Sequence, residues 1–160
     1  NNLNTKGMLL DKTDFDINKV IRDTAASFEG TCNKKRIRLQ LHLTGEELFV
    51  LSDLGKIQQV IYNLLDNAIK FSHEDSIIKI ETTEKKNKLY ISVKDYGIGI
   101  PKEELKLVWD RFYKSDSSRG KDKKGTGLGL SIVRHAVAYH KAEIALESTP
   151  GKGTTITIQF

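Results

Sequence analysis

The sequence contains a single cysteine, Cys32, among its 160 residues. One cysteine permits no internal disulfide, and no group of cysteines and histidines has the spacing of a metal site. A packed core must therefore hold the fold, and a chain of this length can bury one as a single domain. The expected compartment is a reducing cytoplasm.

Long apolar runs are also absent. No stretch approaches the ~20 residues that a membrane span requires, and no signal peptide is present. The chain begins Asn1-Asn2 without an initiator methionine, so we expect a piece of a longer protein that makes no direct membrane contact itself. Residues 1–13 are expected to be the end of an upstream element and a linker, and residues 14–160 one domain.

The positive charge is in small excess and is local. Lysine and arginine number 26 against 21 acidic residues, which gives a net charge of +5. Part of the excess lies in a glycine-flanked segment (Lys121, Lys123, Lys124) and part in a polar turn (Lys85, Lys86, Lys88). Because no basic strand rich in aromatic residues accompanies them, this distribution indicates an anion site and a solvated turn, and no nucleic-acid partner.

The apolar periodicity predicts alternating helices and strand pairs. Asp16 can cap a helix over 17–33, Ser52 or Asp53 can cap a second helix that residues 73–76 end, and Pro101 suits the start of a short third helix closed by 109–112. Strands are predicted at 37–43, 48–52, 77–84, 89–95, 143–148 and 154–160. An exposed, lid-like loop over 114–126 precedes a helix over 127–140. This order predicts an α/β sandwich in which one mixed sheet carries its helices on a single face.

The second of these helices has two contrasting sides. At 100° per residue its apolar side chains gather on one arc, and Gln59, Asn63, Asn67 and Lys70 gather on nearly the opposite one. Asparagine is a mediocre helix former, so two of them one turn apart suggest a role beyond propensity. Amide oxygens suit Mg²⁺ and the phosphates it carries. A merely solvated helix face explains this pattern equally well.

The glycine-rich segment at 125–130 places three alternate glycines at a predicted helix start. Backbone N–H groups and the helix dipole there favour an anion such as a polyphosphate. The pattern lacks the ending of a P-loop and does not directly follow a strand, so neither a Walker nor a Rossmann site is indicated. Tight helix packing is the alternative explanation.

Asp95 ends an apolar strand and is followed by Gly97 and Gly99. A carboxylate at the base of a close-walled pocket accepts a hydrogen bond from the exocyclic amine of adenine, where guanine offers a carbonyl. Phe71 and Tyr96 are near enough in sequence to stack on such a base. A turn aspartate beside ordinary core aromatics is the alternative.

Five segments together resemble, in order and spacing, the N, first glycine, F, second glycine and third glycine boxes of sensor histidine kinases. They are Asn63 to Phe71, Asp95 to Gly99, Arg111 to Tyr113, Gly125 to Gly129 and Gly151 to Thr154. The resemblance covers residues 16–160. It implies the catalytic and ATP-binding domain with the Bergerat fold, which gyrase, the heat-shock chaperone ATPases and the mismatch-repair ATPases share.

The resemblance also implies roles for individual residues. Asn63 and Asn67 would ligate Mg²⁺, and Lys70 and Arg111 would meet the phosphates, so that Asn63, Lys70 and Arg111 form the catalytic set. Asp95 would read adenine. The remaining nucleotide-binding positions would be Phe71, Gly97, Gly99, Ile100, Tyr113, Lys114, Gly125, Thr126, Gly127, Leu128, Gly129, Leu130 and Thr154.

The implied reaction is transfer of the γ-phosphoryl group of ATP to a histidine of a dimerisation domain. None of the four histidines of this chain has the sequence context of that acceptor, so the acceptor would lie upstream in a parent that is a homodimer. The implied further partner is a cognate response regulator, and the implied location is the cytoplasmic part of a membrane-anchored sensor. Two alternatives stay open, a stand-alone anti-sigma-factor serine kinase and a non-catalytic nucleotide sensor or ATP clamp.

Overall fold

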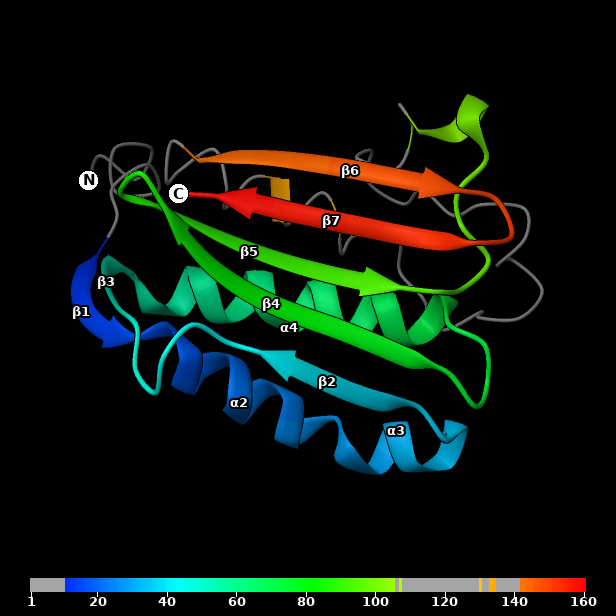
Figure 1. Ribbon diagram of the computed structural model, residues 1–160, viewed down its shortest axis with the longest axis horizontal. Coiled ribbons are helices and arrows are strands. Elements are labelled where there is room, and N and C mark those ends of the chain that lie inside the picture. The colour runs from blue at the N-terminus through cyan, green and yellow to red at the C-terminus, as the bar shows by residue number, and fades with distance from the viewer. Residues whose placement is uncertain (1–10, 106, 108–129, 131–132, 135–141) are drawn as a thin grey trace, which may run out of the picture.

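The computed structural model describes residues 11–105, 107, 130, 133–134 and 142–160 (Figure 1). Its main sheet has five strands in the order β2 (Arg38–His42), β4 (Ile77–Lys85), β5 (Lys88–Asp95), β7 (Gly153–Gln159) and β6 (Glu143–Thr149). Strand β2 runs parallel to β4, and the other neighbours are antiparallel. The sheet is therefore mixed, as predicted.

Three helices pack on one face of this sheet. They are α2 (Ile17–Ser27), α3 (Glu29–Lys35) and α4 (Leu54–Phe71), of which α4 contacts β5 and α2. Alternate residues of the strands supply the other half of the core, as Ile78, Ile80, Ile91 and Ile158 show by their complete or nearly complete burial. The predicted architecture, a mixed sheet with helices on one face, is confirmed.

One helix is interrupted where the periodicity predicts continuity. The predicted helix over 17–33 divides at Phe28, which ends α2 and precedes α3. Its ring is buried and lies 4.9 Å from the ring of Tyr62 on α4. The break therefore lies at an aromatic contact between helices, and the spacing of apolar residues carries no signal for it.

A second sheet was not predicted. Residues Lys12–Asp16 form strand β1, which pairs antiparallel with β3 (Phe49–Asp53) in a two-stranded sheet separate from the main one. The prediction of a single sheet is wrong for the strand at 48–52, and the expected boundary between residues 13 and 14 falls inside β1. A five-residue strand with one buried apolar side chain, Phe15, gives too little alternation to detect.

The other boundaries agree closely with the predictions. The Asp53 side chain accepts from the Lys56 amide and caps α4, and Ser72 follows its last residue. A 3₁₀ turn (Lys102–Glu104) follows Pro101. The predictions for 108–129 and 135–141, including the lid, lie outside the described residues, whereas Val133 is helical and fully buried. Among the residues that the structure describes, no helix has the combined length and apolarity needed to cross a bilayer.

Candidate functional site

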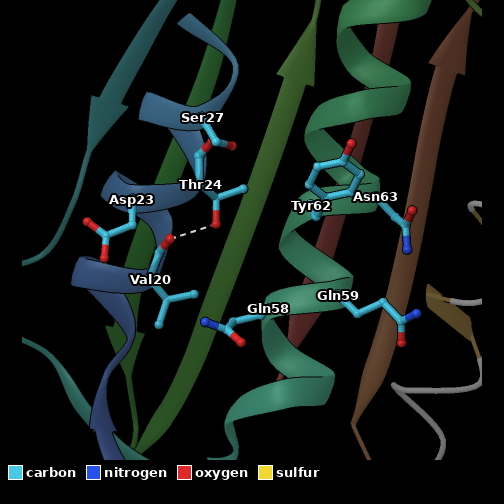
Figure 2. A pocket seen from close by; sticks show the side chains of 8 residues that line it. All are labelled: Val20, Asp23, Thr24, Ser27, Gln58, Gln59, Tyr62 and Asn63. Carbon is cyan, nitrogen blue, oxygen red and sulfur yellow. Dashed lines mark hydrogen bonds between the residues drawn. The ribbon is translucent and has the colours of Figure 1, made fainter.

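The polar side of α4 is separate from its buried side, as the sequence predicts. Ile57, Ile61 and Leu64 are each 1% exposed, whereas Asn63 and Asn67 are half-buried. Figure 2 shows the Asn63 side chain pointing away from α2, like that of Gln59 one turn earlier. The two asparagines lie four residues apart and therefore share one side of the helix.

Asn67 places a buried polar atom near the end of α4. Its Nδ2 atom is buried and has no hydrogen-bond partner among the residues that the structure describes. A buried amide without a partner costs stability, and such groups often mark a place that a ligand completes. Rotation of the carboxamide exchanges its nitrogen and oxygen, so Asn67 is able to present an oxygen at this position. With Asn63 one turn away, the donor set fits Mg²⁺.

Lys70 lies one turn further along α4 and holds an ion pair. Its Nζ atom is 2.9 Å from Oδ2 of Asp66, and both side chains are about one-third exposed (32% and 29%). A partly exposed pair of this type contributes little to stability because water and salt screen it. The Lys70 ammonium can therefore exchange Asp66 for a more highly charged anion.

Asp95 lies at the end of β5 in a buried position, with 7% of its surface exposed. Its Oδ1 atom accepts a hydrogen bond from the Gly97 amide at 2.9 Å. Burial raises the pKa of the carboxyl group, against the opposing effects of the Gly97 and Thr154 amides and the charge of His73. A buried carboxylate of this kind gains from an additional hydrogen-bond donor.

The two glycines after Asp95 permit close contacts on both sides of the loop. A Cβ atom on Gly97 would lie 1.9 Å from the carbonyl oxygen of Phe71, the last residue of α4. The next residue, Ile98, donates to that same oxygen at 3.1 Å. Gly99 has φ +74°, and its Cβ would lie 2.2 Å from the Thr149 carbonyl oxygen. The loop is therefore held between the end of α4 and the turn that joins β6 to β7.

Ser148 belongs to this arrangement and was not predicted from the sequence. Its Oγ atom accepts from the Ile100 amide at 2.7 Å and donates to the Gly153 carbonyl oxygen at 3.0 Å. The hydroxyl of Thr154 lies 2.7 Å away. The signal was available, because Ser148 continues the inward alternation of Ile144 and Leu146, where a polar residue is unusual.

The structure brings together only part of the predicted nucleotide set. Phe71, Asp95, Gly97 and Thr154 come together at the end of α4 through the contacts given above, and Asn67 lies one turn before Phe71 on that helix. Leu130 is helical and packs against the core. Eight predicted residues lie outside the described residues: Arg111, Tyr113, Lys114, Gly125, Thr126, Gly127, Leu128 and Gly129.

Tyr96 was expected either to stack on a base or to lie in the core, and the structure excludes the core position. Its side chain is 38% exposed, so it is not a core residue, and Nζ of Lys94 lies 5.1 Å from the centre of its ring. Lys94 and Asp95 are consecutive strand residues whose side chains point to opposite faces of the sheet. The contact with Lys94 therefore keeps the ring away from Asp95, whereas the backbone of Phe71 lies against Gly97, two residues after Asp95.

A groove of about 610 Å³ lies between α2 and α4. Figure 2 shows Gln58 directed toward α2 across it, and Thr24 donating to the Val20 carbonyl oxygen. Asn63 is the one predicted site residue in its lining. The groove is therefore not the pocket expected at Asp95.

Comparison with known proteins identifies the family. Residues 52–160 match the family described as histidine kinase-, DNA gyrase B- and HSP90-like ATPases. The chain belongs to this family. A curated relative, the sensor histidine kinase WalK of Bacillus subtilis, is 43% identical over 132 residues, which are 81% of this chain and 21% of WalK. The chain thus spans about a fifth of that relative's length.

Solved structures of histidine kinases have the same fold. The nucleotide-free catalytic domain of histidine kinase ThkA is 30% identical and superposes with a TM-score of 0.82, covering 94% of this chain and 95% of that domain. A further structure holds ThkA in complex with the response regulator TrrA, at 29% identity and a TM-score of 0.77, covering 93% of this chain and 41% of that one. The site described above therefore lies in a histidine-kinase-like ATPase domain.

Proposed function

We propose that this chain is the ATP-binding, phosphoryl-donating part of a two-component sensor histidine kinase. The observation that carries the proposal is a pair of buried polar groups around the end of α4, the side-chain nitrogen of Asn67, which has no partner among the described residues, and the carboxylate of Asp95. Asn67 lies on α4 and Asp95 ends β5, and the close contact of Gly97 with Phe71 joins the loop after β5 to the end of α4. One of these groups suits a metal-bound phosphate, and the other suits the amine of adenine.

Each described residue then has a definite task. Asp95 accepts the hydrogen bond of the adenine amine, Phe71 lies beside the base, and Asn63 and Asn67 hold Mg²⁺. Lys70 releases Asp66 and meets a phosphate. The bound Mg²⁺ supplies neutralisation of phosphate charge, and phosphoryl transfer depends mainly on such neutralisation and on positioning.

Transfer is favoured over hydrolysis because of the residue at position 63. In the related gyrase and mismatch-repair ATPases a glutamate at this position activates water, whereas an amide cannot accept a proton at neutral pH. General-base assistance is typically worth ~10²- to 10⁴-fold in rate. The γ-phosphoryl group therefore persists until an imidazole, itself a nucleophile, reaches it.

The acceptor in this proposal is a histidine of the dimerisation domain of a homodimeric parent in the cytoplasm, and the onward partner is a response regulator. Two comparisons support these assignments. WalK is named a sensor histidine kinase, and ThkA has been solved with its response regulator. A serine kinase of the same fold would form an acid-stable phosphoester, and an ATP clamp would form no phosphoprotein, so product chemistry separates the three functions.

A transfer assay tests the proposal. The 160-residue chain is mixed with the separately produced dimerisation domain of its parent and with γ-labelled Mg-ATP. We expect acid-labile label on the dimerisation domain and none on the chain itself. Asn67→Ala should abolish the label, whereas Gln58→Ala, an exposed residue of the same helix, should not. Acid-stable label, or label on the chain, would overturn the proposal.

Phosphate release provides a separate test of position 63. With saturating Mg-ATP and no acceptor, we expect turnover well below ~1 s⁻¹, the low end of the ordinary enzyme range. Asn63→Glu introduces a carboxylate that can act as a general base on water, and it should raise the rate of hydrolysis if the metal site tolerates it. Wild-type turnover at or above that value would favour the ATP clamp.

A further inference from the structure

We propose that Lys35, the last residue of α3, is a positioning residue for the nucleotide site because its ammonium group holds the last turn of α4. The Nζ atom of Lys35 donates a hydrogen bond to the backbone carbonyl oxygen of Ile69 at 2.7 Å. Lys35 lies outside the five segments that carry the family resemblance. Its effect on nucleotide binding rests on the proposed function, whereas its contact with α4 does not.

The last turn of α4 depends on donors outside the helical hydrogen-bond ladder. The final four carbonyl groups of an α-helix have no partner within it, and in α4 these begin at Ala68. The Ala68 carbonyl oxygen accepts from the Ser72 hydroxyl at 2.6 Å. The next one, at Ile69, accepts from the Ser72 amide at 3.3 Å, which is slightly longer than usual. The charged Lys35 donor at 2.7 Å is therefore its stronger partner, and a cation is also favourable at a helix C-terminus.

The position of Ile69 connects this hydrogen bond to the nucleotide site. Ile69 directly precedes Lys70 and lies two residues before Phe71, where α4 ends. The Phe71 carbonyl oxygen accepts from the Ile98 amide at 3.1 Å and lies against Gly97. Helix ends open more readily than helix interiors. A loosened last turn would therefore displace Lys70 and Phe71 together, along with the loop that follows β5.

The backbone of Lys35 is itself held in place. Arg36 has φ 57° and closes α3 in a Schellman motif. In this motif the Arg36 amide donates to the Asn33 carbonyl oxygen at 3.2 Å, and the Ile37 amide donates to that of Cys32 at 2.9 Å. Cys32 and Ile37 are each only 4% exposed, so the motif is anchored in the core. Lys35 therefore reaches α4 from a fixed point.

Arg36 provides an internal comparison at the same corner of the molecule. Its guanidinium group donates to both carboxylate oxygens of Asp75, at 2.6 and 3.0 Å, and both side chains are exposed. Asp75 belongs to the connection between α4 and β4, and its amide donates to the Lys35 carbonyl oxygen at 3.0 Å. An exposed ion pair contributes little because water and salt screen it. We therefore expect the Lys35 ammonium, and not the Arg36 pair, to hold the last turn of α4.

Amide hydrogen exchange and ATP titration of Lys35→Met test the proposal. Methionine keeps an unbranched apolar side chain and removes the ammonium group. We expect the backbone amides of residues 69–72 to exchange about tenfold faster and the Kd for ATP to rise about tenfold, the lower end of the range for a hydrogen bond to a charged group. Unfolding of part of the sample would instead lower the number of ATP sites per chain in calorimetry and leave the Kd unchanged.

Three variants serve as comparisons. Lys35→Arg keeps a cationic donor and should return exchange and Kd to within about threefold of wild type. Lys34→Met removes the same charge from an exposed neighbour on α3 and should change neither. Arg36→Ala removes the ion pair with Asp75 and should change the Kd by less than about twofold.

The outcomes separate this role from the proposed function. Unchanged exchange at 69–72 in Lys35→Met would overturn the proposal, and so would faster exchange with an unchanged Kd for ATP. An equal loss of affinity in Arg36→Ala would also overturn it, because the whole corner would then hold the site. A wild-type chain that binds no ATP would refute the proposed function, and faster exchange in Lys35→Met would still support the hold of Lys35 on α4.

Discussion

Two aspartates show how two regions of this molecule differ, the start of α2 at Asp16 and the candidate nucleotide site at Asp95. Asp16 and Asp95 each end a strand, and each accepts hydrogen bonds from backbone amides. Burial alone would raise the pKa of Asp16, but the amides of Leu48, Lys19 and Asn18 and the charge of Arg22 together lower it. Hydrogen bonds and charge therefore outweigh burial at this carboxylate, which caps α2.

Asp95 has the opposite balance. Burial is the largest effect on its carboxyl group and raises the pKa despite the amides of Gly97 and Thr154 and the charge of His73. It lies near α4, where the side-chain nitrogen of Asn67 has no hydrogen-bond partner among the described residues. A carboxylate at the end of a strand is therefore not by itself the mark of the candidate site, which differs from the region of Asp16 in the raised pKa of Asp95 and in the Asn67 nitrogen that has no partner among the described residues.

The largest expected effect comes from a methyl group at Gly97. Gly97→Ala places a Cβ atom 1.9 Å from the Phe71 carbonyl oxygen, and backbone cannot rotate away as a side chain would. Overpacking of this kind costs ~1 to 3 kcal/mol and occasionally more, and we expect the upper end together with loss of ATP binding. Urea unfolding and titration calorimetry measure the two effects.

Gly30→Ala is the matched control. A Cβ atom at Gly30 meets nothing within 4 Å, and the residue lies inside α3. Alanine should therefore stabilise the protein by ~0.5 to 1 kcal/mol through helix propensity, with ATP binding unchanged. Similar losses at both glycines would mean that the loop after Asp95 is not tightly held.

The next effect concerns the choice of purine. Asp95 should favour ATP over GTP, because guanine presents a carbonyl where adenine presents an amine. A hydrogen bond to a charged group is worth ~1.5 to 3 kcal/mol, or roughly 10- to 150-fold in affinity. Titration calorimetry with both nucleotides measures the preference, and Asp95→Asn should reduce it. An unchanged preference in that variant would assign selectivity to another residue.

Sequence reasoning recovered the elements whose signals are local. The alternation of β4 and β5 and the capping aspartates of α2 and α4 are short-range features, and each was found within a few residues. The polar side of α4 was found in the same way. The roles of its asparagines came instead from the combined motifs, because each motif alone had an ordinary structural explanation.

Features that depend on tertiary contacts were missed. Strand β1 exists because β3 pairs with it, and its own five residues show one buried apolar side chain. Ser148 acquires its place through Ile100 and Gly153, which are distant from each other in sequence. Alternation indicates that Ser148 points inward, but no periodicity records which residues pair with it or with β1.

A smaller effect is expected from Asp16 at the start of α2. Asp16→Ala removes the side-chain cap of α2 and the acceptor of the Leu48 amide. Loss of an N-cap costs ~0.5 to 2 kcal/mol, so the urea midpoint should fall while ATP affinity stays unchanged. Asp16→Asn keeps one oxygen acceptor and should recover part of the loss. Reduced ATP affinity in a fully folded Asp16→Ala protein would show that the two regions are coupled.

The smallest expected effect is a difference in pH dependence between the two aspartates. The folded-state pKa of Asp95 is raised, so the folded protein binds its proton more tightly than the unfolded chain, and the stability from this group is lost as the pH rises through the folded value. The folded-state pKa of Asp16 is lowered, so its contribution is present above the unfolded value and is lost as the pH falls. The measurement is the free energy of unfolding in urea of the nucleotide-free wild type, Asp95→Asn and Asp16→Asn at about pH 4 and about pH 7. As the pH rises from about 4 to about 7, the free energy of unfolding of Asp95→Asn should increase relative to wild type, and that of Asp16→Asn should decrease relative to wild type. Changes of the same sign would contradict the opposite pKa shifts of the two carboxylates and would remove this distinction between the two regions.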